Sequence, residues 1–177
     1  MLKLVDAEEK YLDGYKEAYI LSLREIEKGN IKKHDLMFCN PCEVDIVQRC
    51  KDSRDRSKLK HGYVPSYEYF LVDDDKFIGT ISIRTELTPA LTNYGGNIGY
   101  AINPKYWKMG YGTILLKLGL QKARKLTFQD RVLITCDDDN VGSYKIIEKN
   151  GGVLENKIEN TDEGETFLTR RYWINIK

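Results

Sequence analysis

The sequence has no long apolar run, no excess of one charge and little histidine, and each shortage excludes a class of protein. Among 177 residues, 28 are Lys or Arg and 27 are Asp or Glu, so the net charge is +1. A near-neutral chain without a concentrated basic face is a poor candidate for nucleic acid or an anionic membrane surface. No apolar run approaches a membrane span, and the opening residues MLKLVD do not resemble a signal peptide. We therefore expect a cytoplasmic protein with no nucleic-acid partner and no membrane partner.

Proline-rich linkers, low-complexity tracts and internal repeats are missing too. A chain of 177 residues is long enough for one domain with its own core and short for two. We therefore expect a single domain that spans residues 1–177.

Cysteine is scarce, with four in the chain, and Cys39 and Cys42 form a lone C-x-x-C motif near His34. No second C-x-x-C and no histidine pair follows to complete a zinc site. The motif does not lie at a strand-to-helix turn, which would lower the pKa of a thiol. We expect neither a metal site nor thiol chemistry here, and we expect Cys136, on an apolar strand, to be a buried small residue.

The most informative stretch is residues 97–152, which begins with a strand, a loop and a helix. The apolar run 98–102 predicts a strand, and Pro104 ends it because proline has no N–H for a ladder. Gly110 and Gly112 flank the predicted helix start, where a side chain would block a ligand and where positive φ is needed. The helix is predicted from apolar residues at helical spacing, namely Ile114, Leu116, Leu118, Leu120 and Ala123.

This helix start predicts a site for phosphate or pyrophosphate. The first N–H groups of a helix have no partners and carry partial positive charge, and Lys108 adds a full charge. A pair of glycines also serves turn geometry alone, and that alternative stays open. Two familiar phosphate motifs do not fit. The chain has no P-loop, and a dinucleotide fingerprint would need glycine at Leu115 and an acidic residue after the strand 132–134, whereas Asp130 precedes it.

Three motifs in order resemble the GNAT acetyltransferases. Residues 107–112 (WKMGYG) fill the family's acetyl-CoA signature, (Arg/Gln)-x-x-Gly-x-(Gly/Ala), except at its first position. Residues 138–143 (DDNVGS) resemble its strand-to-helix junction, and residues 147–152 (IEKNGG) resemble its helix-end x-E-K-x-G segment. The similarity covers roughly residues 67–175. It implies an α/β (α+β) GNAT fold, with a mixed, mostly antiparallel twisted sheet flanked by helices.

Residue patterns supply elements for such a fold. Helices are predicted over 6–28, with its tyrosines packed in the core, and over 43–58. A β-hairpin is predicted over 67–72 and 77–84, followed by a loop over 85–96. Beyond the long helix we expect a strand over 132–136 parallel to the first, a helix over 140–150, and a hairpin over 153–158 and 167–176.

The resemblance also implies a cofactor site for acetyl-CoA. Backbone groups of Ala101 and Ile102 would contact the pantetheine and the thioester carbonyl. Asn140 would meet the pantetheine amides beside the small residue Ser143, although Asn also favours the helix N-cap and both roles are compatible. Trp107 replaces the usual Arg or Gln, which we expect to weaken binding without abolishing it. The pyrophosphate would bind N–H groups of Lys108, Met109, Gly110, Tyr111, Gly112 and Thr113, with the Thr113 hydroxyl as an extra donor.

Proton transfer is harder to assign. The tyrosine with which many family members protonate the thiolate falls on Ile147 here. Tyr144, one turn earlier, is a candidate acid, and packing explains it equally well. Glu86 is a candidate base, and its alternative is a solvated loop carboxylate.

The implied function is acetyl-CoA-dependent N-acetyl transfer to a primary amine of an unidentified acceptor, either a small molecule or a peptide. Helices within residues 1–60 would form the acceptor side of the site, and residues 97–152 the acetyl-CoA-binding core. Because Ile147 departs from the pattern, a non-catalytic acetyl-CoA-binding module is the alternative. GNAT folds often pair, so a homodimer is a further expectation.

Overall fold

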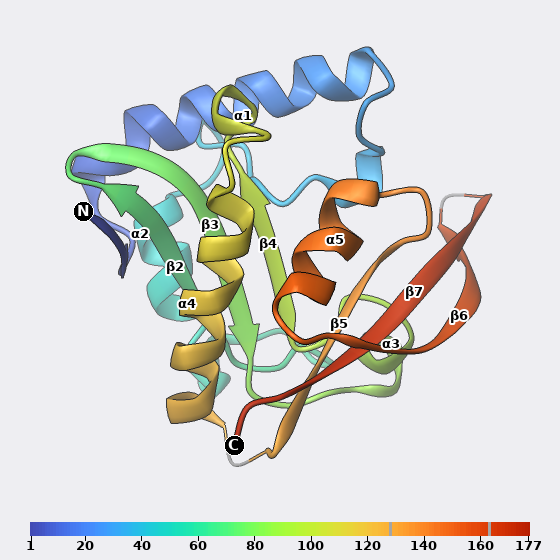
Figure 1. Ribbon diagram of the computed structural model, residues 1–177. Helices are drawn as coiled ribbons and strands as arrows, with labels where there is room; N and C mark the ends of the chain where they lie inside the picture. Colours follow the sequence, from blue (N-terminus) through green and yellow to red (C-terminus); the bar gives the residue numbers. More distant parts are fainter. Residues whose placement is uncertain (128, 163) are drawn as a thin grey trace.

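The computed structural model describes residues 1–127, 129–162 and 164–177, and its strands form two antiparallel sheets. The first sheet has the order β1-β2-β3-β4, made of β1 (Leu2–Val5), β2 (Ser66–Asp73), β3 (Lys76–Arg84) and β4 (Ile98–Ile102). The second has the order β5-β7-β6, made of β5 (Arg131–Asp137), β6 (Val153–Asp162) and β7 (Glu165–Asn175). Antiparallel sheets flanked by helices agree with the expected fold class (Figure 1).

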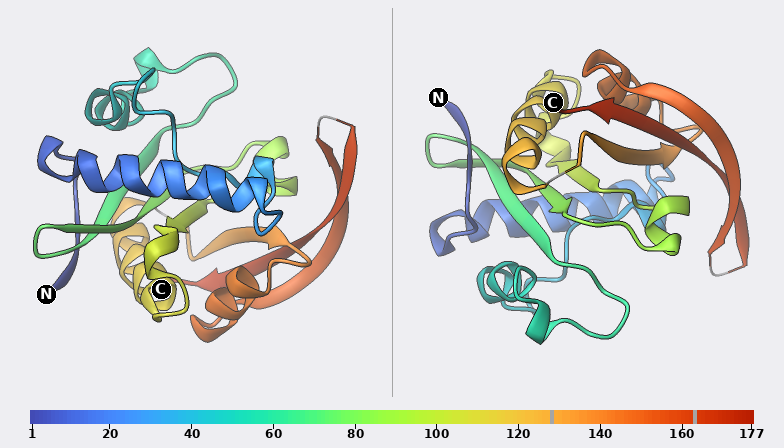
Figure 2. Two further views of the ribbon diagram at one scale, coloured as in Figure 1. Left: turned by 90° about the horizontal axis from the view of Figure 1, so that it is seen from above. Right: turned by 90° about the horizontal axis from the view of Figure 1, so that it is seen from below.

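Helices cover both faces of the first sheet (Figure 2). Helices α1 (Leu12–Glu27) and α2 (Ile46–Asp52) pack on one face, and α4 (Tyr111–Leu126) and α5 (Val141–Lys149) lie on the other. The remaining short elements are α3 (Pro89–Asn93) and the 3₁₀ turns η1 (Glu9–Tyr11), η2 (Lys33–Asp35), η3 (Arg56–Lys58) and η4 (Pro104–Tyr106). No helix among the described residues is long and apolar enough to cross a membrane.

The sequence of β2 explains why helices are needed on both faces. Side chains of a strand alternate between faces, so Phe70 and Val72 join the core beneath α1 and α2, while Leu71 joins the core beneath α4. All three side chains are fully buried. Each such burial stabilises the fold by roughly 1.5–3 kcal/mol.

Strands β4 and β5 meet at one end and diverge from there (Figure 1). The Asn97 N–H donates to the Leu133 carbonyl at 2.7 Å, and the Leu133 N–H donates to Asn97 Oδ1 at 2.8 Å. Within the described ranges no ladder continues between the two strands. The single mixed sheet predicted from the sequence is therefore two antiparallel sheets that are joined at Asn97 and separate beyond it.

Several predicted boundaries are corrected. Strand β1 lies before the first helix and is fixed by pairing with β2, from Leu2 opposite Asp73 to Val5 opposite Phe70, which no local pattern reveals. The predicted helix 43–58 is only α2, because Ser53 caps its end and the turn η3 follows. The predicted loop 85–96 contains α3, which has Thr88 as its cap and Pro89 at its start, a recognised helix-start signal. The final hairpin is longer than predicted at both strands.

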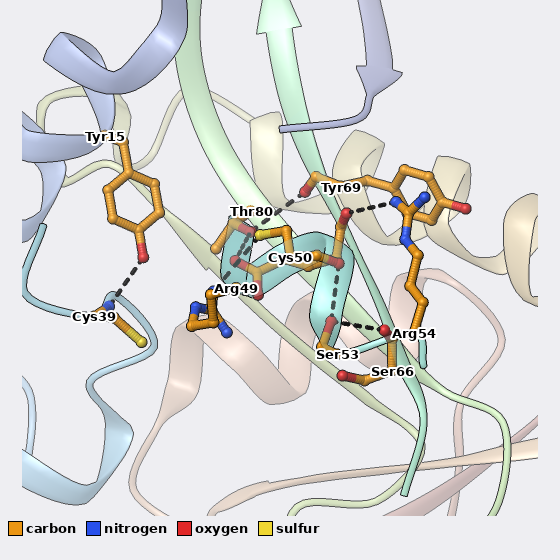
Figure 3. A network of polar contacts seen from close by, with 10 residues as sticks. Tyr15, Cys39, Arg49, Cys50, Ser53, Arg54, Ser66, Tyr69 and Thr80 are labelled. Atoms are coloured by element: carbon orange, nitrogen blue, oxygen red, sulfur yellow. Dashed lines mark hydrogen bonds and ion pairs between the residues drawn. The ribbon is translucent and has the colours of Figure 1, made fainter. Parts of the chain in front are cut away.

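Segment 30–42 is anchored beneath α1. The Tyr15 hydroxyl accepts a hydrogen bond from the Cys39 N–H at 2.9 Å (Figure 3), and Tyr15 is fully buried as predicted.

All four cysteines are free thiols; Cys136 is buried as expected and Cys42 is exposed. In the same region Arg49 of α2 binds the buried carboxylate of Glu68 at 2.6 Å, which ties α2 to the sheet.

Candidate functional site

A cleft of about 950 Å³ opens where β4 and β5 separate. Its walls are β4, the start of α4, the start of α5, and residues between Ser22 and Phe38. Met109, which is 61% exposed, is not among the lining residues. The other predicted cofactor residues all line the cleft: Ala101, Ile102, Lys108, Gly110, Tyr111, Gly112, Thr113, Asn140 and Ser143.

The N-terminus of α4 opens into this cleft without a side-chain cap among the described residues. Gly110, the residue before the helix, has φ of 85°, the left-handed conformation that glycine adopts without strain. The first N–H groups of the helix therefore have no intrahelical partners, and they carry the positive end of the helix dipole. Lys108, Lys145 and Lys149 also line the cleft. This end of the cleft is suited to an anion.

Gly112 also has a packing role beside the one predicted from the sequence. A Cβ at this position would lie 2.4 Å from Ile146 Cδ1, so the end of the Ile146 side chain on α5 would have to move to admit it. Trp107 is likewise structural, because its indole N–H donates to the Ile102 carbonyl at 2.9 Å at the end of β4. Its side chain is therefore not a spare donor for phosphate.

Asn140, Ser143 and Tyr100 connect α5 to β4. Asn140 Oδ1 accepts the Ser143 N–H at 3.0 Å, so it is the N-cap of α5 while its side chain also borders the cleft. The Tyr100 hydroxyl lies 2.9 Å from Ser143 Oγ. Burial raises the pKa of Tyr100 above its ordinary value, so the phenol stays protonated, and its hydroxyl donates to the Ser143 carbonyl at 3.2 Å. Sequence reasoning missed Tyr100, although strand alternation places residues 98, 100 and 102 on one face.

The structure does not bring the two candidate proton-transfer residues into the cleft. Glu86 is exposed and forms an ion pair with Arg56. Tyr144 packs against the core, with the Arg170 guanidinium 4.0 Å from its ring centroid. Neither side chain is among those that line the cleft. Ile147, at the position of the family's tyrosine, is fully buried in the core.

A cluster of charged side chains lies where η2 meets the end of β5, and its members Lys32, Asp35 and Asp139 line the cleft. The potential ligand atoms of His34, Asp35 and Asp137 lie within 4.8 Å of one another. Asp137 Oδ2 is 2.9 Å from His34 Nε2 and 2.9 Å from the Lys32 ammonium, which also reaches Asp139 at 3.0 Å. Sequence reasoning missed this cluster, because 103 positions separate His34 from Asp137.

Burial and charge perturb the cluster. The Asp137 side chain is 1% exposed, and its Oδ1 has no hydrogen-bond partner among the described residues. Burial, with the negative charge of Asp137, raises the pKa of Asp35 from 3.8 to about 6. Burial lowers the pKa of Lys32, but hydrogen bonds to Asp137 and Asp139 outweigh burial and leave it raised. Three carboxylates, those of Asp35, Asp137 and Asp139, thus gather around the Lys32 ammonium and the His34 ring.

The chain matches a known protein family over most of its length. Residues 37–153 match the model of a family described as acetyltransferase (GNAT) domain. No curated protein sequence matches the chain.

Comparison with solved structures gives the same fold. The microcin C7 self-immunity acetyltransferase MccE, in complex with acetyl-CoA and AMP, aligns with TM-score 0.69 and 15% identity over 98% of this chain and 92% of its own. RimL, the ribosomal L7/L12 alpha-N-protein acetyltransferase, aligns with TM-score 0.70 and 16% identity over 98% of this chain and 90% of its own. A GNAT-family acetyltransferase from Bacillus anthracis aligns with TM-score 0.67 and 19% identity over 99% of this chain and 95% of its own.

Proposed function

The chain belongs to the GNAT acetyltransferase family, and on that premise we propose that it transfers the acetyl group of acetyl-CoA to a primary amine. The observation that carries the proposal is the uncapped N-terminus of α4, which opens into a cleft of about 950 Å³. When bound, acetyl-CoA supplies an activated acetyl group as its thioester.

The residues around α4 fit the negatively charged part of that molecule. Free N–H groups from Lys108 to Thr113 would bind the pyrophosphate, and the Lys108 ammonium would add charge. Lys145 and Lys149, on the facing helix α5, line the same cleft and would bind further phosphate oxygens. A binding site made mainly of backbone groups does not require the arginine that Trp107 replaces.

The pantetheine chain would lie between the separated strands. Backbone groups of Ala101 and Ile102 are available there, because beyond Asn97 the edge of β4 that faces β5 has no ladder among the described residues. The Asn140 side chain and Ser143 would contact its amides from α5. The bond between Tyr100 and Ser143 would keep α5 at a fixed distance from β4.

The solved relatives support an amine acceptor of more than one kind. RimL is described as acting on a protein α-amine, and another aligned structure as a putative phosphinothricin N-acetyltransferase. For this chain we propose a small-molecule or peptide amine.

Two measurements on the full chain test the function. Acetyl-CoA at about 100 times its Kd should stabilise the fold by roughly 2.7 kcal/mol in a thermal-shift assay, while ATP and NAD should stabilise it much less. Release of free thiol from acetyl-CoA across an amine panel then tests turnover. Binding without turnover on any amine would favour the non-catalytic module instead, and tighter binding of another nucleotide would contradict the cofactor assignment.

A further inference from the structure

Building on the proposed function, we propose that the acceptor enters the cleft as a primary ammonium ion and that the Asp35 carboxylate binds it and accepts its proton. Asp35 belongs to the short turn η2, which follows the loop after α1. Asp35 and Lys32 line the same cleft as the start of α4, so an acceptor held by Asp35 would share one cavity with the cofactor.

The first argument is an unsatisfied buried acceptor. Asp137 is 1% exposed and uses only Oδ2, which meets both His34 Nε2 and the Lys32 ammonium at 2.9 Å. Its Oδ1 has no partner among the described residues. A buried carboxylate oxygen without a donor is costly, and such an atom in a native fold indicates a missing ligand or ion. Asp137 itself does not line the cleft, so a donor in the cleft would meet this cluster at Asp35, which does.

The second argument is the distribution of charge along the walls of the cleft. Lysines 108, 145 and 149 line it at the α4 and α5 end. Glu25, Asp35 and Asp139 line the wall contributed by the N-terminal segment and the end of β5. Glu25 is paired with Lys28 at 2.7 Å and Asp139 with Lys32 at 3.0 Å, so Asp35 is the carboxylate there that has no such ion pair among the described residues. One end therefore suits an anion and the other a cation, which is the arrangement that an anionic cofactor and a cationic acceptor require.

The third argument is the identity of the cation. Lys32 and His34 already bind Asp137 Oδ2, so a divalent metal would have to displace an ammonium from the shared oxygen. An organic ammonium needs only hydrogen-bond acceptors, and its three N–H donors can reach Asp35 without disturbing Lys32. The neighbouring lining residues Leu36, Met37 and Phe38 offer apolar contact to the carbon chain of such a molecule.

The proton balance is simple. One proton moves from the bound ammonium to the Asp35 carboxylate, which leaves a neutral amine with its lone pair free. The nitrogen then forms a bond to the acetyl carbon as the carbon–sulfur bond breaks, and a second proton from nitrogen goes to the leaving sulfur. The proton on Asp35 returns to solvent, so the carboxylate is ready for the next acceptor.

The test measures amine binding without acetyl-CoA. The probe is 1,4-diaminobutane and its neutral match is 1,4-butanediol, at equal ionic strength, titrated into the full chain and followed by thermal shift and calorimetry. The variants are Asp35→Asn and, as a matched control on the exposed face of α1, Asp13→Asn. The diamine should bind the unmodified chain and the control equally, the diol should not bind, and Asp35→Asn should weaken diamine binding by about tenfold or more.

A second measurement covers the case in which Asp35→Asn does not fold. In the unmodified chain, diamine affinity should rise as the pH rises through about 6, where Asp35 ionises beside Lys32, His34, Asp137 and Asp139. Equal diamine binding by Asp35→Asn, or flat affinity across that pH range, would overturn the proposal. The proposal would also be overturned if Zn²⁺ stabilised the unmodified chain but not Asp35→Asn, and the diamine stabilised neither. That result would identify a metal site. Acetyl-CoA binding to the unmodified chain is measured in a separate titration. Failure to bind acetyl-CoA would refute the proposed function, whereas the proposal for Asp35 is decided by diamine binding.

Discussion

Asn97 and Leu133 exchange two hydrogen bonds at the point where the two sheets meet, with Asn97 donating from its backbone at 2.7 Å and accepting at its side chain at 2.8 Å. The Asn97 side chain thereby takes the place of a strand partner for Leu133. Its Nδ2 group also donates to the Arg84 carbonyl at 3.2 Å. Fixing one end of β4 and β5 while the other end stays apart creates the cleft.

Replacing Asn97 should destabilise the fold. Asn97→Ala leaves the buried Leu133 N–H without its acceptor, so we expect a loss of about 1–3 kcal/mol in the free energy of unfolding. Urea unfolding measures it, with Asn93→Ala, at an exposed position, as the control. A change no larger than that of the control would show that the joint is not needed.

A negative charge at the α4 start should impair cofactor binding. Gly110→Asp and Gly110→Asn have the same shape, both tolerate the left-handed conformation, and nothing lies within 4 Å of the added Cβ. They differ in charge alone. We expect acetyl-CoA to bind Gly110→Asp about tenfold or more weakly than Gly110→Asn by calorimetry, with the gap narrowing at high salt. Equal affinities would place the phosphates elsewhere.

The role of Gly112 can be separated into packing and binding. Gly112→Ala should lower the melting temperature slightly. Its Cβ would lie 2.4 Å from Ile146 Cδ1, and because that atom is the end of a flexible side chain, the cost should fall at the low end of the roughly 1–3 kcal/mol typical of overpacking. Adding Ile146→Val removes that Cδ1 and should restore most of the stability. If the double variant stayed as unstable as Gly112→Ala, the contact with Ile146 would not be the reason for glycine.

Asp35 should make stability depend on pH. Its pKa is about 6 in the folded protein against an ordinary 3.8, so between these values the folded state binds more protons and stability falls as pH rises. Asp35→Asn removes the titrating carboxyl group and with it this fall in stability. Its melting temperature relative to the unmodified chain should therefore increase from pH 4 to pH 7 in the absence of ligand. Asp13→Asn should show no such trend, and a trend of the opposite sign would contradict the partly buried position of Asp35 beside Asp137.

Glu86 and Tyr144 should be dispensable for proton transfer, because both lie outside the cleft lining. Glu86→Gln and Tyr144→Phe are each expected to keep kcat/KM within about threefold once an acceptor is known, since no transition-state contact is removed. A hundredfold loss of kcat in either variant, with unchanged stability, would restore that residue as an acid or base.

Local sequence was sufficient wherever neighbouring residues fix the structure. The strand 98–102, the glycine turn and the helix that follows were predicted because alternation, proline and helical periodicity act within a few residues. The hairpin of β2 and β3 was predicted for the same reason. The motif resemblance placed every predicted cofactor residue except Met109 on one cleft.

The predictions from sequence are wrong where contacts between residues far apart in the chain determine which side chains are buried. Ile114 was assigned to the apolar face of α4 but is 37% exposed, while Leu115 and Gly119, absent from the predicted stripe, are buried. Glycine at 119 lets α4 lie close to β3, because a Cβ there would lie 2.2 Å from Ile81 Cδ1 and would force that buried side chain to shift. No helical period contains that information, since it depends on how closely α4 approaches the sheet.

The sequence by itself determined that this chain carries a strand, a glycine-containing turn and a helix in the GNAT order, because each signal is local. Only the tertiary structure decided that Glu86 and Tyr144 lie outside the cleft and that Asp35 lies in it. The loop after α1 meets the end of β5 there, which joins His34 to Asp137 across 103 positions. Burial then leaves Asp137 Oδ1 without a hydrogen-bond partner among the described residues, a result of packing that the order of residues along the chain does not reveal.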